Sequence, residues 1–321
     1  KVAMAHDEFA IIERYFSNIG DPAGNAVLGV GDDAAVVDVA PGHQLVVSMD
    51  TLLGGIHFPV DTCPADIAYK ALAVNLSDLA AMAASPAWFL LSLTLPENDS
   101  NWLRQFSVGL RQAADQFNLR LIGGDTCRGE LSITIQIAGL VPSDRFVTRG
   151  QATAGDLILV SGELGNAGLG LAQKQAKVDL PGDLQSRCLL ALNRPQPRLE
   201  LIPFLREFAS AAIDISDGLQ GDLAHVLRSS GCGARISRDA LPVNAWIEQQ
   251  QAYHYALGAG DDYEICCCIP ARHREEIENW NLDHPECRLT EIGEVTESGY
   301  VLEEGERLID LTNLQGYRHF D

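Results

Sequence analysis

Acidic residues recur beside glycine or small polar residues at five separated points of this chain. They occur in the segments Gly29–Asp33, Ser48–Asp50, Asn75–Asp78, Gly123–Asp125 and Asp214–Gly218. Several of these segments follow apolar runs that are typical of β-strands, and glycine lets the backbone turn sharply beside a ligand. Carboxylates held in such turns are suited to binding Mg²⁺ against nucleotide phosphates. The pattern therefore indicates phosphate chemistry that is assisted by a metal.

The segment Gly29–Ala34 also has the spacing G-x-G-x-x-A, which is a variant of a dinucleotide-binding fingerprint. A pyrophosphate bound there would face Asp32 and Asp33, and residues 35–39 resemble a short strand where the fingerprint requires a helix. We therefore interpret the two aspartates as ligands of a metal or of water. A solvated turn is the simpler alternative.

Asp78 lies in a helical run that otherwise consists mainly of Ala, Leu, Val and Met, and Asn75 is three residues earlier on the same face. An unpaired buried charge costs several kcal/mol, so a cation, an ion pair with Lys70 or solvent must account for it. Asp50 is expected at the end of an apolar strand, where Ser48 can supply a neutral oxygen ligand. Capping of a helix or turn is the alternative role for Asp50.

The segment Asp214–Gly218 is expected to end one strand and to begin a helix. Ser216 and its amide can then meet phosphate oxygens, while Asp214 and Asp217 reach metal ions. The alternative is a simple Asp N-cap. Gly123 and Gly124 are expected to form a second turn of this kind, which presents Asp125 to a ligand.

These segments must be positioned by a mixture of strands and helices. The expected strands cover residues 44–49, 88–95, 119–122, 131–137, 156–160, 211–215, 263–269 and 289–295. An amphipathic first helix is expected over Phe9–Ile19, and further helices are expected from Pro64, after Asp99 or Ser100, up to about Lys174, over 218–229 and from Arg272. Because these strands and helices do not alternate regularly along the chain, we predict an α+β fold.

The length of 321 residues predicts two domains. Pro142 and the polar stretch that follows it to Gly155 read as a junction, so we predict an N-terminal domain over 1–145 and a C-terminal domain over 146–321. The three residues before Met4 fit a native start and an added remnant equally well.

The net charge of −21 argues against binding to nucleic acid, because no block of Lys or Arg can displace its counterions. No apolar run is long enough to span a membrane and no signal peptide is visible, so we expect a cytoplasmic, soluble protein. The eight cysteines show no metal-site pairs. We predict that Cys266–Cys268 place alternate sulfur atoms on the two faces of a strand.

Taken together, the order and spelling of these motifs resemble the thiamine-monophosphate kinase family over essentially the whole chain. The longest shared segment is Tyr69–Met82, and the others include Gly31–Asp33, Ser48–Thr51, Ile122–Thr126, Ile213–Leu219 and Asp262–Glu264. The resemblance implies a two-domain α+β fold shared with aminoimidazole ribonucleotide synthetase and selenophosphate synthetase. It also implies a homodimer that forms through the N-terminal sheets and binds ATP near the dimer interface.

The same resemblance implies roles for individual residues. The positions that match metal ligands are Asp33, Ser48, Met49, Asp50, Asp78, Asp125, Asp214 and Asp217, and Met49 would act through its carbonyl oxygen. The positions that match nucleotide contacts are Gly124, Asp125, Arg149 and Ser216, and those that match thiamine contacts are His57, Asp261 and Tyr317. This chain departs from the family where Met49 replaces threonine and where Asp261 replaces glutamate.

The expected reaction is phosphorylation of thiamine monophosphate by ATP, with several Mg²⁺ ions and direct in-line transfer. The acceptor phosphate is already largely ionised at neutral pH, so no residue is needed as a general base. Charge neutralisation is needed instead, and Asp78 and Asp125 are the most critical carboxylates. Other ATP-using enzymes of the superfamily, and a non-catalytic nucleotide- or metal-binding protein, are the alternatives.

Overall fold

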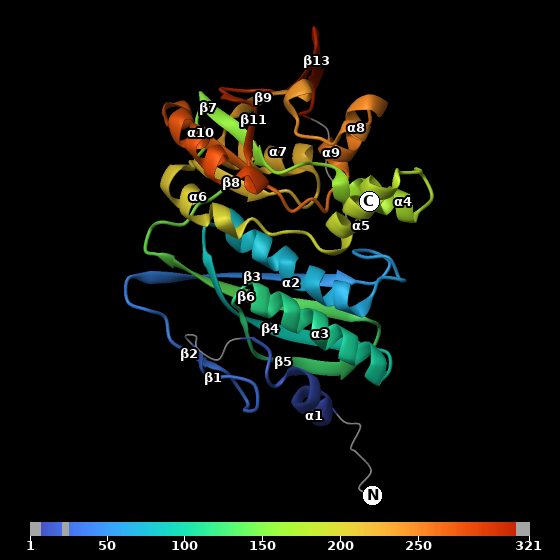
Figure 1. Cartoon of the computed structure of the whole chain (residues 1–321). Coiled ribbons are helices and arrows are strands. Elements are labelled where there is room, and N and C mark those ends of the chain that lie inside the picture. Colours follow the sequence, from blue (N-terminus) through green and yellow to red (C-terminus); the bar gives the residue numbers. More distant parts are fainter. Residues whose placement is uncertain (1–7, 21–25, 313–321) are drawn as a thin grey trace, which may run out of the picture. The chain divides into compact units, whose positions relative to one another are not determined.

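The computed structural model describes residues 8–20 and 26–312 of the chain. The chain forms two compact units, one of residues 1–79 and 84–144 and the other of residues 80–83 and 145–321 (Figure 1). Within the described residues, no helix is both long and apolar enough to cross a bilayer. The α+β class predicted from the sequence is confirmed, because both units combine helices with largely antiparallel sheets.

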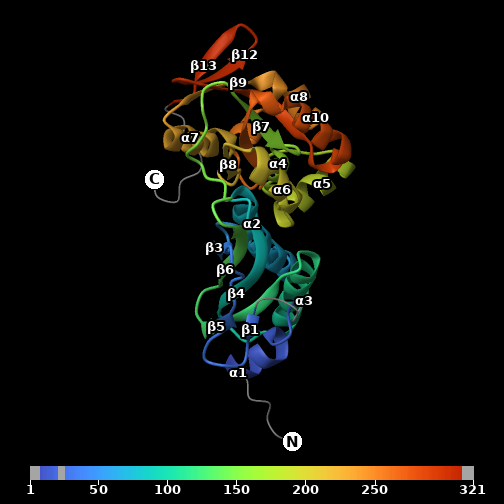
Figure 2. The same ribbon diagram turned by 90° about the vertical axis from the view of Figure 1, so that its left-hand side faces the viewer.

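The first unit contains a four-stranded sheet with the strand order β3-β6-β4-β5. Its strands are β3 (His43–Leu53), β4 (Ser85–Leu95), β5 (Arg120–Arg128) and β6 (Ser132–Pro142), and only the pair β4–β5 is parallel. The helices α2 (Pro64–Ala81) and α3 (Ser100–Gln116) lie on the same face of this sheet (Figure 2). The side chain of Asp99 caps α3 by accepting hydrogen bonds from two backbone amides, as the sequence predicts.

The start of the chain differs from the expected long amphipathic helix. It forms a short helix α1 (Glu8–Ile11) followed by one π-helical segment, Ile12–Phe16. Phe16 and Ile19 are buried, so the apolar face is used although the regular helix ends early. The following strands β1 (Ala26–Leu28) and β2 (Val36–Val37) pair with each other in a separate two-stranded sheet.

The second unit is built on a seven-stranded sheet with the order β13-β12-β9-β11-β7-β10-β8. Its strands are β7 (Asp156–Ser161), β8 (Ala211–Asp214), β9 (Gly233–Ser237), β10 (Ile265–Pro270), β11 (Leu289–Thr296), β12 (Tyr300–Glu304) and β13 (Arg307–Asp310). Its longer helices are α4 (Asn166–Lys174), α5 (Gly182–Asn193), α6 (Ile202–Phe208), α7 (Leu219–Ser230) and α10 (Arg274–Asp283), with the shorter α8 (Ala245–Gln250) and α9 (His254–Gly258) between them. Of these, α5, α6, α8, α9 and the strands β9, β12 and β13 were not expected.

Helices cover both faces of this sheet, and β10 shows how. Cys266 and Cys268 pack into one apolar cluster, whereas Cys267 packs into the other. All three side chains are buried. The prediction that their sulfur atoms alternate between two faces is confirmed, and burial raises the pKa of each thiol. These cysteines are therefore core residues.

Candidate active site

Two predicted metal ligands, Asp50 and Asp78, meet in the first unit. Their carboxyl groups are hydrogen-bonded to each other, and Ser48 Oγ donates to Asp78 Oδ2 over 2.5 Å. The backbone N–H of Asp50 donates to Asn75 Oδ1 over 3.1 Å. Burial and the neighbouring Asp78 charge raise the pKa of Asp50 to about 7. Two carboxylates this close repel each other unless a proton or a cation lies between them.

The periodicities of one strand and one helix bring these side chains together. Along β3, Ser48 and Asp50 are two residues apart and share the face that packs on α2. On α2, Asn75 and Asp78 are three residues apart and share the face toward β3. Asn75 is fully buried and donates its side-chain N–H to the Ala71 carbonyl, which fixes its oxygen toward the strand. Lys70, one of the partners considered for Asp78, donates a hydrogen bond to the backbone oxygen of His57.

This group has the chemistry of a magnesium site. Its donors are two carboxylates and a hydroxyl, which are the hard oxygen ligands that Mg²⁺ prefers, and a cation can replace the proton shared by Asp50 and Asp78. Over residues 8–20 and 26–312, no three His, Cys, Asp or Glu side chains come together as a complete metal site. The predicted ligands are gathered into smaller groups within each unit.

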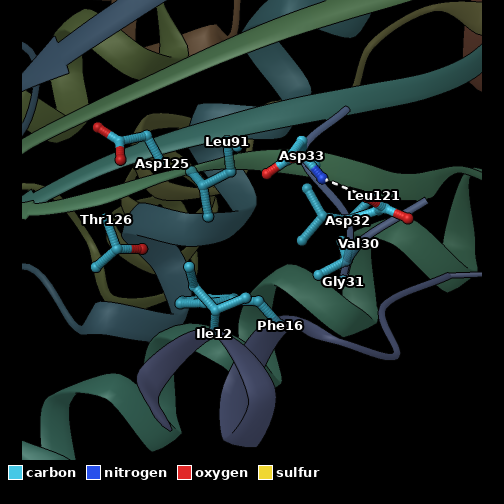
Figure 3. A pocket seen from close by; sticks show the side chains of 12 residues that line it. Ile12, Phe16, Val30, Gly31, Asp32, Asp33, Leu91, Leu121, Asp125 and Thr126 are labelled. Carbon is cyan, nitrogen blue, oxygen red and sulfur yellow. Dashed lines mark hydrogen bonds between the residues drawn. The ribbon is translucent and has the colours of Figure 1, made fainter. Parts of the chain in front are cut away.

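Asp33 and Asp125 line a cavity of about 310 Å³ in the first unit, whose lining includes neither Asp50 nor Asp78. The cavity is bounded by Ile12, Phe16, Val30, Gly31, Asp32, Asp33, Leu91, Leu121, Gly123, Gly124, Asp125 and Thr126. It combines an apolar floor with carboxylates at the rim, as a nucleotide pocket requires. Figure 3 shows the Asp125 carboxylate on the opposite side from Asp33 and turned away from it. The two side chains therefore do not form one ligand pair here.

The expected turn at Gly123–Asp125 is wrong, because these residues lie inside strand β5. Gly124 pairs with Leu91 of β4, and a Cβ atom on Gly124 would lie 1.8 Å from the Leu91 carbonyl oxygen. A bulge at Phe89 and Leu90 accompanies this approach. Gly124 is thus required by strand pairing at the cavity wall. Sequence reasoning placed both glycines of this segment beside a ligand but assigned the wrong backbone structure.

His57 lies in the loop between β3 and α2 and is half-buried. Its Nδ1 accepts a hydrogen bond from the backbone N–H of Leu53 over 2.9 Å. Because Nδ1 is the acceptor, Nε2 carries the proton in the neutral ring. The side chain can therefore offer one N–H donor to a ligand. Met49, on the uncovered face of β3, is 62% exposed.

In the second unit, β8 ends at Asp214 and α7 begins at Leu219, as predicted. The N-cap of α7 is Gly218, with φ of 98°, so the alternative of an Asp N-cap is wrong. Asp214 is 4% exposed, whereas Ser216 and Asp217 are half-buried. The segment 214–218 is called the acidic turn from here on.

The sequence reasoning missed Asp222, in the first turn of α7. Its Oδ2 accepts the backbone N–H groups of Ser216 over 3.0 Å and of Asp217 over 2.9 Å. Burial raises the pKa of Asp222 to about 7, although these N–H groups and Arg149 lower it. Arg149 therefore lies close enough to influence this carboxylate. The sequence does contain a signal for this contact, because a carboxylate lies five residues after Asp217, in the expected first turn of the helix.

Asp261 is hydrogen-bonded to the acidic turn. Its backbone N–H donates to Ser216 O over 2.8 Å, and that of Tyr263 donates to Ile215 O over 2.8 Å. Asp261 and Tyr263 have φ of 64° and 50°, so this segment is a tight turn with two residues in the left-handed region. Tyr317, the third predicted thiamine contact, lies outside the described residues. The thiamine roles of His57 and Asp261 remain predictions.

The comparisons with known proteins agree with this architecture. Residues 31–141 match the N-terminal domain of the family described as AIR synthase related protein, and residues 153–303 match its C-terminal domain. The chain is therefore a two-domain protein of the AIR synthase related class.

Relatives of higher identity define the family more closely. Thiamine-monophosphate kinase of Escherichia coli (strain K12) is 42% identical over 99% of each chain. The crystal structure of thiamine-monophosphate kinase from Stenotrophomonas maltophilia has a TM-score of 0.82 at 41% identity and covers 88% of this chain and 92% of that one. A solved structure of AaThiL complexed with AMPPCP and TMP has a TM-score of 0.75 at 29% identity, covering 88% and 89%. The chain belongs to the thiamine-monophosphate kinase family and is an enzyme of the kinase class.

Proposed function

We propose that this protein transfers the γ-phosphoryl group of ATP to thiamine monophosphate, forming thiamine diphosphate and ADP. The observation that carries the proposal is the Asp50–Asp78 carboxyl pair, held by Ser48 and Asn75, in a chain of this family. The complex of AaThiL with AMPPCP and TMP supports the choice of nucleotide and acceptor. The acidic turn of the second unit adds carboxylates of the same kind.

The acceptor is itself a phosphate, so two anions must approach each other. Bound Mg²⁺ would neutralise charge on the phosphates and on the transferred group. Asp50 and Asp78, with Ser48, would hold such an ion, as would Asp214 and Asp217. Arg149 would add a charge-assisted contact to phosphate oxygens.

The chain's own residues would position the reactants for in-line attack by an acceptor oxygen on the γ-phosphorus. Ser216 and Gly124 would contact the nucleotide, with Gly124 allowing its backbone to line the cavity without a side chain. His57 would offer its Nε2–H to the thiamine monophosphate. No residue needs to remove a proton, because the attacking oxygen is already ionised at neutral pH.

The proposed function is tested by incubating the purified protein with ATP, Mg²⁺ and thiamine monophosphate and by separating the products chromatographically. We expect thiamine diphosphate and ADP in equal amounts. Formation of ADP without thiamine diphosphate would show that thiamine monophosphate is not the acceptor. Turnover of formylglycinamidine ribonucleotide would favour the alternative of a synthetase of the same superfamily. Nucleotide binding without turnover of either acceptor would favour a non-catalytic protein.

We also propose a cytoplasmic homodimer that forms through the uncovered face of the first unit's sheet. This face carries Leu45, Val47 and Met49 of β3, with exposed fractions of 41%, 47% and 62%. A row of exposed apolar side chains on one strand favours burial against a second chain. Val47→Lys is expected to shift the mass in light scattering from dimer to monomer. A wild-type monomer at micromolar concentration would contradict the dimer.

A further inference from the structure

Asp222 makes an unusual backbone contact for a residue inside a helix. It is the fourth residue of α7 and is only 3% exposed. A single oxygen, Oδ2, accepts the N–H groups of both Ser216 and Asp217, which lie six and five residues earlier, outside the helix. The N-cap residue, Gly218, has no side chain that could serve them. Asp222 therefore reaches back from the first turn of α7 to N–H groups that precede the helix, much as the acidic residue of a capping box does.

The two N–H groups belong to the acidic turn, so their positions decide where its side chains point. Successive N–H groups held by one acceptor fix the peptide planes of Ser216 and Asp217. The two hydrogen bonds also point these N–H groups at Asp222 and away from a ligand. What remains for a ligand is the Ser216 hydroxyl and the Asp217 carboxylate, and Asp222 sets the backbone from which both project.

The same turn holds the segment that carries Asp261. Ser216 O accepts the Asp261 N–H, and a Cβ atom on Gly260 would lie 2.6 Å from that same oxygen. A Cβ atom on Gly218 would lie 2.7 Å from Gly258 Cα. The backbones of the two segments are thus in direct contact, and a shift of one moves the other. Ser216 connects Asp222 to Asp261, because its N–H donates to Asp222 and its carbonyl oxygen accepts from the Asp261 N–H.

We propose that Asp222 is a positioning residue that holds the acidic turn, and through Ser216 the Asp261 segment, in the geometry that the reaction needs. It acts through other residues and touches neither nucleotide nor acceptor. The proposal rests on the proposed kinase function. It predicts that loss of Asp222 affects the use of both substrates, because the acidic turn is assigned to the nucleotide and Asp261 to the acceptor.

The test compares substitutions of Asp222 with a matched substitution elsewhere in the unit. Asp156 is equally buried, at 4% exposure, and its Oδ2 also accepts a backbone N–H, that of Thr153, over 3.0 Å. Its partners belong to neither the acidic turn nor the Asp261 segment. Asp156→Ala therefore reports the cost of removing a buried aspartate, without the positioning role. Asp222→Asn keeps one oxygen that can accept both N–H groups.

We expect Asp222→Ala to raise the KM for ATP and for thiamine monophosphate by about 10- to 100-fold, the range seen when supporting residues behind a site are removed. Asp156→Ala should leave both KM values within about two-fold of wild type, although it also lowers the thermal midpoint. Asp222→Asn should recover most of the lost substrate affinity. Direct titration with a nonhydrolysable ATP analogue should show the same order as the KM values.

Three results would overturn the inference. These are unchanged KM values in Asp222→Ala, equal losses in Asp156→Ala, or a failure of Asp222→Asn to bind the analogue better than Asp222→Ala. If Asp222→Ala does not fold, Asp222→Glu is measured in its place. The longer side chain of glutamate keeps the carboxylate but displaces its oxygen atoms. Normal KM values in a folded Asp222→Glu variant would also overturn the inference. An inactive wild-type protein would instead defeat the proposed function, so the two failures are distinguishable.

Discussion

The close approach of β4 and β5 at Gly124 predicts a large effect from the smallest possible substitution. Gly124→Ala adds one methyl group, whose carbon would lie 1.8 Å from Leu91 O and 2.7 Å from the Leu91 carbonyl carbon. Real Cβ atoms do not approach a backbone oxygen so closely, so the two strands must separate or change register. Gly42→Ala is the matched control in the same unit, because Gly42 has φ of 76° but no atom within 4 Å of the added Cβ.

The two substitutions share one cost and differ in the other. Placing a side chain at positive φ costs about 1 kcal/mol in either variant. Overpacking in a close-packed region adds about 1–3 kcal/mol, so Gly124→Ala should lose about 2–4 kcal/mol in total. At about 3 °C per kcal/mol for a unit of this size, the thermal midpoint should fall by about 6–12 °C in Gly124→Ala and by about 3 °C in Gly42→Ala.

Differential scanning calorimetry and titration with a nonhydrolysable ATP analogue measure the two consequences separately. Because Gly124 lines the 310 Å³ cavity, its displacement should also weaken nucleotide binding, whereas Gly42→Ala should bind normally. Equal midpoints for the two variants would refute the argument from strand contact. A destabilised Gly124→Ala with normal affinity would keep the packing argument but remove Gly124 from the nucleotide site.

Three further predictions concern single contacts. The pKa of Asp50 is raised to about 7 in the folded, Mg²⁺-free protein, so ionisation of Asp50 destabilises the folded state increasingly as pH rises from about 4 to 7. In urea unfolding with a chelator at about pH 8, Asp50→Asn should therefore be more stable than wild type by about 1–2 kcal/mol. A lower stability of this variant would contradict the Asp78 contact. His57→Asn keeps an acceptor for the Leu53 N–H but loses the Nε2 donor, so this variant should fold normally and have a raised KM for thiamine monophosphate. An unchanged KM would show that His57 does not contact this substrate. Glu264→Gln breaks a buried ion pair with Arg198 and should cost about 3–5 kcal/mol in urea unfolding, and a loss below about 1 kcal/mol would show that the pair contributes little.

Several elements followed directly from local sequence patterns. The strict alternation of apolar residues predicted β6, and the β8–acidic turn–α7 succession followed from an apolar run that ends in Asp214 and a helical pattern after Gly218. Asp99 was a recognisable cap because its side chain can reach amides two and three residues ahead. In each case, the decisive contacts are made by residues near one another in the chain.

The errors have an equally physical cause. The segment Gly123–Asp125 looks like a turn because glycine favours turns, but it pairs with β4, which is about 30 residues distant in the chain. Only the partner strand shows that the absence of a side chain at Gly124 makes room for the Leu91 carbonyl. The π-helical end of the first helix and the unexpected helices α5 and α6 likewise depend on packing that the local sequence does not display.

The types and order of the residues specify which chemistry this protein can perform, because carboxylates and small residues are covalent properties of the chain. The sequence also identifies the family, since the residues of the motifs and their order resemble those of thiamine-monophosphate kinases over essentially the whole chain. Which carboxylates meet depends on the folded chain, which brings Asp50 to Asp78 across a strand and a helix and places Asp222 behind the acidic turn. Electrostatic and hydrogen-bond energies depend on distances of a few ångströms, and those distances are set by how strands and helices pack.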